Sequence, residues 1–267
     1  MGLDPRTQAV LEAVAWHTVA IVPEKRLELA TGVCLRFRDE YWVVTAGHAI
    51  KAWGLDRVFF ITRPPVTLLT AAKGDLVRRF REEGSAHERF RPTIVGYVES
   101  DVVEDLILLR LAEPEGGIQF HALETAISSP TVGEQVLIFG LPMETARNAT
   151  DAVSGEKAGM VFFTFDWLPV VDRSEQDFMD YDPRVHFLVD FPEGPDPTDY
   201  VTEPHGLSGA GLWRPPRPAP KDRIWNPRTV TLVGIQTGWY SRSRLLKATR
   251  IERVVDLLTS ASRTASR

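Results

Sequence analysis

The sequence has little cysteine: Cys34 is the single cysteine among 267 residues, so no disulfide can form within the chain. Disulfides are frequent in secreted proteins and rare in the reducing cytosol. The first residues, Met1 to Thr7, also lack the basic segment and apolar run that make up a secretory signal. These absences together lead us to expect a cytoplasmic protein.

Long apolar runs are absent as well. The stretch 9–21 is apolar, but Glu12 and His17 interrupt it, and it is shorter than the roughly 20 residues that a membrane-spanning helix needs. The net charge of −5 does not suit a general nucleic-acid binder, because such proteins neutralise phosphates with a basic surface. We therefore expect neither a membrane nor a nucleic-acid partner.

Motifs that bind metals are missing too. The sequence has no His-Glu-x-x-His motif and no cluster of cysteine and histidine, which are the patterns that zinc sites use. We therefore expect no metal site and no cofactor.

What the sequence does hold is a series of short segments that are rich in β-branched and aromatic residues, a pattern typical of β-strands. We expect strands over 18–22, 31–37, 41–45, 58–62, 93–98, 106–111, 135–139, 160–165, 185–189, 209–213 and 229–237. Apolar residues at helical spacing occur near the two ends, in 6–15 and in 249–260. Many short strands with a short helix at each end predict an all-β protein of barrel or sandwich type.

A run of Ala, Glu, Pro and Gly at 112–117 separates the strands into two groups. We predict an N-terminal helical extension over 1–16, a first β lobe over 17–113 and a second β lobe over 114–267 that ends in the C-terminal helix. Lobes of about 100 residues each are large enough to bury a core of their own.

Three segments carry side chains that suit nucleophilic catalysis. His48 lies in Val-Val-Thr-Ala-Gly-His-Ala, Asp105 begins Asp-Leu-Ile-Leu-Leu-Arg-Leu, and Ser208 lies in Gly-Leu-Ser-Gly-Ala-Gly-Leu. In acyl transfer an imidazole takes the proton from a weak hydroxyl nucleophile, while a carboxylate orients the ring and stabilises its charged form. The three side chains together predict a site for acyl transfer.

The order of these residues along the chain distinguishes the chymotrypsin arrangement of a catalytic triad from that of an α/β-hydrolase. The order His, Asp, Ser is that of chymotrypsin, whereas an α/β-hydrolase needs a histidine after its serine. No histidine follows His205, so none can serve Ser208 in that way. Glu104 and Asp101 stay open as alternative acids, and we favour Asp105 because the apolar strand begins directly after it.

On these motifs the sequence resembles the trypsin-like (chymotrypsin-fold) serine peptidases, and in particular the bacterial members without disulfides, over roughly 30–258. The segment 45–49, TAGHA, is similar to the family motif TAAHC, and 105–109, DLILL, resembles DIALL. The segment 206–210, GLSGA, resembles GDSGG, and 232–238, LVGIQTG, resembles the strand that lines the substrate cleft.

The resemblance implies two six-stranded antiparallel β-barrels of the chymotrypsin fold, with His48, Asp105 and Ser208 in the cleft between them. It also implies an oxyanion hole formed by the backbone N–H groups of Gly206 and Ser208, which would stabilise the charge on the substrate carbonyl oxygen. The upstream segment 31–33, TGV, is like a strand of small residues in bacterial members.

The substrate-contacting positions of the family correspond to one residue at the pocket base, one at its rim and three along the cleft strand: Thr202, His205, Thr237, Gly238 and Trp239. Because Thr202 is neutral, a preference for Arg or Lys does not follow from the resemblance. The acidic segment 166–203 is open to two interpretations, a solvated loop or a surface that attracts basic substrates over a long distance.

One departure from the family concerns activation. Leu207 stands where many members have an aspartate that pairs with a new N-terminus after cleavage of a precursor. We therefore expect the chain to be competent without such processing.

We predict a serine endopeptidase that hydrolyses polypeptide substrates through a His48–Asp105–Ser208 triad and an acyl-enzyme intermediate. The alternative is a trypsin-like domain that serves mainly as a regulatory or protein-binding module, with a partner protein that the sequence does not identify.

Overall fold

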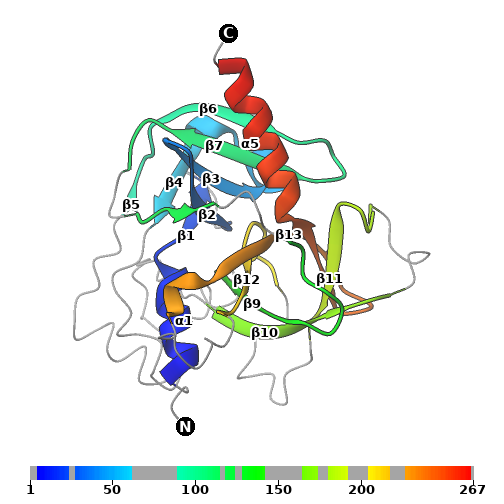
Figure 1. The fold of residues 1–267 in the computed structure, drawn as a ribbon. Coiled ribbons are helices and arrows are strands. Elements are labelled where there is room, and N and C mark those ends of the chain that lie inside the picture. The colour runs from blue at the N-terminus through cyan, green and yellow to red at the C-terminus, as the bar shows by residue number, and fades with distance from the viewer. Residues whose placement is uncertain are drawn as a thin grey trace, which may run out of the picture.

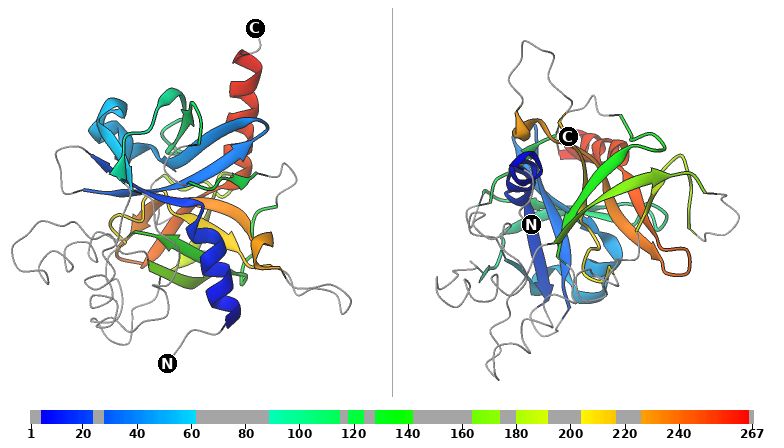
Figure 2. Two further views of the ribbon diagram at one scale, coloured as in Figure 1. Left: turned by 90° about the vertical axis from the view of Figure 1, so that its left-hand side faces the viewer. Right: turned by 90° about the horizontal axis from the view of Figure 1, so that it is seen from below.

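The computed structural model describes residues 5–23, 28–61, 89–114, 118–123, 128–141, 164–173, 180–191, 204–216 and 226–265. Two β-sheets make up most of this structure, and helices α1 (Pro5–Ala15) and α5 (Ile251–Ala265) lie at opposite ends of it, as Figure 1 and Figure 2 show. The prediction of a mostly β protein with a helix near each end is therefore confirmed.

The first sheet has eight strands: β1 (Thr18–Pro23), β2 (Ala30–Phe37), β3 (Glu40–Ala46), β4 (Val58–Ile61), β5 (Arg89–Phe90), β6 (Ile94–Glu99), β7 (Leu106–Leu111) and β8 (His121–Ala122). The order is β5-β4-β1-β2-β3-β7-β6, with β8 added in parallel beside β2. Among the described residues no pairing joins β5 to β6, so this sheet is curled but open. In the described residues it differs in this from the closed barrel that we expected.

The second sheet closes on itself. Its strands are β9 (Gln135–Gly140), β10 (Thr164–Val171), β11 (His186–Asp190), β12 (Gly211–Arg214), β13 (Thr231–Tyr240) and β14 (Leu245–Arg250). They form a closed barrel in the order β10-β11-β14-β13-β12-β9 with antiparallel pairing throughout. The expected six-stranded barrel is present in this half of the chain.

A common hydrophobic core joins the two sheets. One buried cluster contains Val33 and Leu108 from the first sheet together with Leu137 and Trp213 from the barrel. Removing apolar surface from water contributes about 25 cal/mol per Å², so this cluster stabilises the docking of one sheet on the other. Each sheet also has a buried apolar cluster of its own, one within the curl of the first sheet and one inside the barrel.

Each terminal helix contacts the half of the molecule that is remote from it in the sequence, and α5 contacts its own half as well. Helix α1 precedes the first sheet, but it packs against β9 and the short helix η3 (Pro227–Thr229) of the second half. Helix α5 follows the barrel, but it packs against β6 as well as β13 and β14. Likewise β8 lies beyond residue 113, where we placed the boundary of the first lobe, and pairs with β2 of the first sheet.

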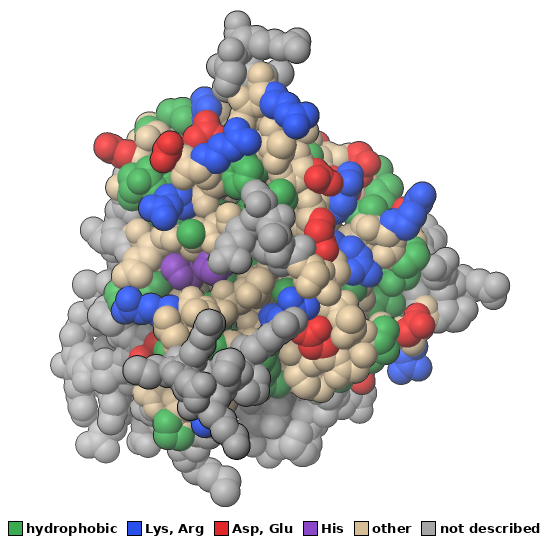
Figure 3. Space-filling model, viewed as in Figure 1, with side chains coloured by type: hydrophobic (Ala, Val, Ile, Leu, Met, Phe, Trp, Pro, Cys, Tyr) green, Lys and Arg blue, Asp and Glu red, His purple; other side chains and the backbone are tan. Residues whose placement is uncertain are grey.

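The surface carries charges of both signs. On the face seen in Figure 3, the described acidic and basic side chains are interspersed. Large apolar side chains exposed among the described residues are Val95, Tyr97, Val102 and Val132. No helix in the described part of the chain is long and apolar enough to span a membrane.

Candidate active site

His48 follows directly on a buried strand of the first sheet. Strand β3 ends at Ala46, and helix α2 (Gly47–Trp53) begins immediately after it. In the ladder between β3 and β7, Ala46 pairs with Leu106. This register places the start of α2 beside the residue that precedes Leu106, which is Asp105.

The backbone of Asp105 has a positive φ of 51°. In this conformation its main chain and side chain both face the start of α2, because its carbonyl oxygen accepts the Gly47 N–H at 2.8 Å and its Oδ1 accepts the His48 N–H at 2.8 Å. The first N–H groups of a helix have no partner within the helix. Asp105 therefore satisfies two of them.

The other carboxylate oxygen of Asp105 contacts the ring of His48. Asp105 Oδ2 lies 2.5 Å from His48 Nδ1, and His48 Nε2 lies 3.1 Å from Ser208 Oγ. With Nδ1–H donating to the carboxylate, Nε2 carries the lone pair that can accept the Ser208 proton. The Asp105 side chain is 16% exposed and that of His48 is 52% exposed, so the ring is accessible while its acidic partner is mostly covered.

The structure also separates Asp105 from the two alternative acids. Glu104 forms an ion pair with Arg253 of α5. Asp101 Oδ1 accepts the N–H groups of Val103 and Glu104 at 3.0 and 2.9 Å and so closes the turn. Of the three acids, Asp105 is the one that contacts His48.

Ser208 lies in a tight turn that depends on glycine. Gly206 and Gly209 have φ values of +92° and +88°, a region that glycine enters easily and other residues enter at a cost. A Cβ at position 209 would lie 2.0 Å from the Thr31 carbonyl oxygen and 2.2 Å from Thr45 Oγ1. Glycine is thus required at 209 both by the backbone conformation and by the close approach of the first sheet.

Thr31, in strand β2, fastens this turn to the first sheet. Its N–H donates to Ser208 O at 2.9 Å, and its hydroxyl donates to Gly206 O at 2.9 Å. The same hydroxyl accepts the Leu141 N–H at 3.0 Å, and Thr45 Oγ1 donates to Thr31 O at 2.7 Å. The sequence presents Thr31 only as part of a strand of small residues, because its partners lie up to 177 positions away.

The predicted oxyanion hole consists of the backbone N–H groups of Gly206 and Ser208. Within the described ranges, the N–H groups of Gly206 and Ser208 donate no hydrogen bond, whereas Leu207 N donates to Pro204 O at 2.9 Å and Gly209 N donates to Gln236 O at 2.8 Å. The Gly206 carbonyl is turned toward Thr31. The two amides are therefore available to a substrate oxygen.

Leu207 is fully buried and packs in the core of the barrel with apolar neighbours that include Ala210 and Leu246. The position at which the resemblance placed the activating aspartate of many trypsin-like peptidases holds an apolar side chain here. The turn around Ser208 is held by core packing and by Thr31.

Four of the five predicted substrate-contacting residues lie in the described part of the chain, and Thr202 lies outside it. Strand β13 carries Thr237, Gly238 and Trp239 directly after Gln236, which holds the Ser208 turn. Thr237 Oγ1 lies 3.0 Å from Thr249 Oγ1, and Gly238 O accepts from Gln236 Nε2 at 2.9 Å. His205 is exposed on the turn itself.

Lys247 of β14 is a buried cation near the site that the sequence does not single out. Its Nζ donates to Asp180 O at 3.2 Å. Burial lowers the pKa of Lys247, while attraction to Asp105 and Asp180 acts in the opposite direction. A Cβ at Gly238 would lie 2.9 Å from Lys247 Cε, so glycine at that position leaves room for the lysine stem against β13.

Burial lowers the pKa of three other histidines that lie outside the His48–Asp105–Ser208 series of contacts, His17, His121 and His186. Burial lowers the pKa of His121 to about 4, and the neighbouring His17 adds to this effect. Burial likewise lowers the pKa of His186 to about 4, with Lys247 contributing. Within the described ranges, no group of three or more His, Cys, Asp or Glu side chains is placed to hold a metal ion.

No protein-family model and no curated protein sequence matches the chain. Among solved structures it is similar to a scabies mite inactivated protease paralogue, with 15% identity and a TM-score of 0.59 over 95% of this chain and 96% of that one. The protein thus has the fold of the trypsin-like (chymotrypsin-fold) serine peptidases, as the sequence motifs indicated.

Proposed function

We propose that the protein is a serine endopeptidase in which Ser208 is the nucleophile, His48 the general base and Asp105 the orienting acid. The observation that supports this most is the unbroken series of contacts from Asp105 Oδ2 to His48 Nδ1 at 2.5 Å and from His48 Nε2 to Ser208 Oγ at 3.1 Å. A serine hydroxyl needs such a base, held by a third group, to act as a nucleophile near neutral pH.

In the proposed reaction His48 Nε2 takes the Ser208 proton as Oγ attacks the substrate carbonyl carbon. The negative charge that forms on the carbonyl oxygen accepts hydrogen bonds from the N–H groups of Gly206 and Ser208. Protonated His48, stabilised by Asp105, then gives its proton to the leaving amine, and the acyl group stays on Ser208 Oγ. Water, deprotonated by His48, repeats the sequence and releases the carboxylic acid.

Polypeptides are the substrates in this proposal, and strand β13 with Thr237, Gly238 and Trp239 is the surface along which they would lie. His205 and Thr202 would contact the side chain next to the cleaved bond. The proposal includes competence without N-terminal processing, because Leu207 is already packed in the barrel core. It also includes a cytoplasmic location.

A second candidate function is a protein-binding module that retains the fold but makes little use of catalysis. The observation that favours it is the similarity to a protease paralogue that is described as inactivated. The intact series of contacts among His48, Asp105 and Ser208 favours the peptidase.

A fluorophosphonate probe, which reacts with activated serine hydroxyls, separates the two. We expect the folded chain to be labelled and Ser208→Ala to be unlabelled with an unchanged circular dichroism spectrum. Ser243→Ala is the matched control, because Ser243 is exposed in the turn between β13 and β14 and donates only to Tyr240 O. A folded wild-type chain that resists the probe would contradict the peptidase and favour the binding module.

A further inference from the structure

Asp105 lies at the end of a turn, and its own backbone has an uncommon conformation. Its φ of +51° lies in the left-handed region, which residues with a Cβ adopt uncommonly, although Asp does so more readily than most. The turn joins β6 to β7, and Asp105 is its last residue. The contacts that fix the turn therefore decide where the Asp105 carboxylate lies.

Part of the restraint is local. Asp105 N donates to Asp101 O at 3.1 Å, and the Asp101 side chain accepts the N–H groups of Val103 and Glu104. Ser100 Oγ accepts the Leu106 N–H at 2.8 Å. These bonds shape the turn, but none of them ties it to the rest of the molecule.

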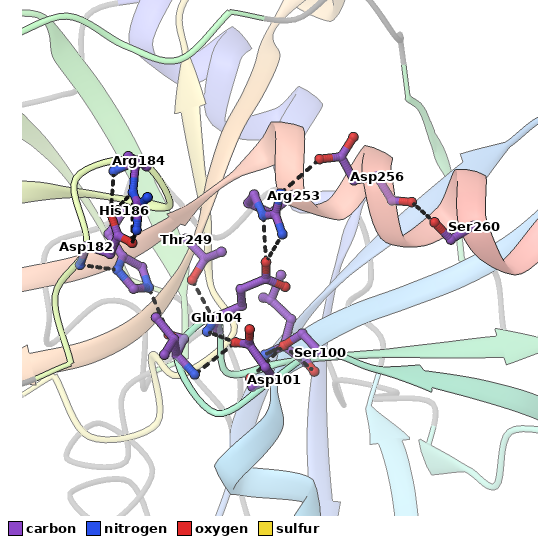
Figure 4. Close-up of polar contacts among 12 residues, drawn as sticks. Ser100, Asp101, Glu104, Asp182, Arg184, His186, Thr249, Arg253, Asp256 and Ser260 are labelled. Carbon is purple, nitrogen blue, oxygen red and sulfur yellow. Dashed lines mark hydrogen bonds and ion pairs between the residues drawn. The ribbon is translucent and has the colours of Figure 1, made fainter.

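Apart from the bonds between Asp105 and the start of α2, further restraint comes from three elements of the second half of the chain, and Figure 4 shows them converging on the turn. His186 of β11 contacts Val103 O through Nε2 at 2.9 Å. Thr249 of β14 donates to Glu104 O at 2.7 Å. Arg253 of α5 donates to the Glu104 carboxylate, with Nε 2.5 Å from Oε1 and Nη2 also in contact.

Glu104 is the residue on which two of these contacts meet, and its side chain is only 4% exposed. A buried carboxylate is stable when it is paired and strongly unfavourable when its partner is removed. Removal of Arg253 would therefore favour a movement of the Glu104 side chain toward water. Because Glu104 shares a peptide bond with Asp105, that movement displaces Asp105 as well.

We propose that Glu104 is a positioning residue for Asp105, held in place by Arg253, so that the docking of helix α5 sets the geometry of the His48–Asp105 pair. The effect on catalysis rests on the proposed peptidase function. The effect on the His48–Asp105 hydrogen bond does not, since that bond is present without any substrate.

The variant Arg253→Met tests this by proton NMR and by kinetics, at a temperature at which the variant is fully folded. A proton in an N–H···O hydrogen bond as short as that between His48 and Asp105 resonates far downfield, and His48→Gln identifies the resonance by removing it. We expect Arg253→Met to shift or broaden this resonance. We also expect kcat to fall about 10- to 100-fold with KM nearly unchanged, because a small displacement of a catalytic group has an effect of that order.

Two further variants make the result specific. Asp256→Asn removes the other partner of Arg253, an acid that is 64% exposed and 3.1 Å away, and it should leave both the resonance and kcat unchanged. Arg253→Lys keeps a positive charge without the planar donor pair, so it should recover part of the lost kcat and move the resonance in the same direction by less.

A folded Arg253→Met with the wild-type resonance and wild-type kcat would overturn the proposal. If that variant does not fold, Arg253→Lys carries the test, and an unmoved resonance there overturns it equally. A wild-type chain that resists the fluorophosphonate probe contradicts the peptidase function instead, while the resonance still reports on the positioning of Asp105.

Discussion

At the scale of single residues, Asp105 combines a positive φ with a carboxylate that contacts both the backbone and the ring of His48. In Asp105→Asn an amide replaces the carboxylate, and its N–H group facing Nδ1 would favour the wrong tautomer of the ring. A change of this kind lowers kcat about 10⁴-fold in a triad of this type, and we expect a loss of that order in peptide hydrolysis. Asp39→Asn, an exposed acid in the turn between β2 and β3, is the control. Near wild-type kcat in Asp105→Asn would mean that another group orients His48.

Two glycines with similar backbone angles differ in what surrounds them. Gly209 and Gly133 have φ values of +88° and +84°, but a Cβ at 209 would overlap Thr31 O, whereas a Cβ at 133 meets nothing within 4 Å. Gly133→Ala should cost about 1–2 kcal/mol of unfolding free energy through backbone strain alone. Gly209→Ala should cost more than that, because a steric clash adds to the strain. Urea denaturation of the two variants measures the difference, and equal losses would show that the turn can move away from β2.

At the scale of elements, strand β2 anchors the Ser208 turn through Thr31. In Thr31→Val the Gly206 carbonyl and the Leu141 N–H lose a buried partner, and we expect a loss of about 1–3 kcal/mol. The rate of fluorophosphonate labelling of the folded variant should also fall, because Gly206 is no longer held. Thr18→Val is the matched control, since Thr18 is also buried and its hydroxyl donates to Val14 O, in helix α1. Equal labelling rates in the two variants would show that the hydroxyl of Thr31 serves stability alone.

The sequence predicts the residues of the candidate site more closely than it predicts the bounds of the strands. Residue type and order predict His48, Asp105 and Ser208 as a catalytic set, because the chemistry restricts the choice and each lies beside an apolar strand or in a glycine turn. The structure brings the three side chains into contact. The sequence predicts a strand over 160–165, of which 160–163 lie outside the described residues, whereas β10 continues from Thr164 to Val171. The presence of Asp166 and Pro169 hides its strand character, which comes from pairing with β9.

Other features depend on contacts between distant parts of the chain. Strand β8 has two residues, and its pairing with β2 leaves no local pattern. The roles of Thr31, Lys247 and Arg253 arise where β2, β14 and α5 meet segments more than 60 positions away. Local propensity contains no information about such contacts, so the sequence alone could not assign them.

At the scale of the whole molecule, buried histidines link stability to pH. Burial lowers the pKa of His121 and of His186 to about 4, below the value of about 6.5 in the unfolded chain. The unfolded state therefore binds more protons than the folded state between pH 6.5 and 4. The contribution of these two histidines to the free energy of unfolding is fully present above pH 6.5 and is lost as the pH falls through this range. The melting temperature should decrease from pH 7 to pH 5, and His121→Gln should flatten that decrease. A melting temperature that is constant over this range would contradict this.

The contacts of each terminal helix with the distant half have a consequence for how the chain can be divided. A fragment ending at residue 114 contains α1 without β9 and η3, and a fragment beginning at residue 118 contains α5 and β8 without β6 and β2. Each fragment would expose an apolar surface that only the other can cover, so neither is expected to fold when expressed alone. Coexpressed, the two pieces should associate and regain the fluorophosphonate reactivity of the intact chain. The protein would then behave as a split reporter whose output requires both parts.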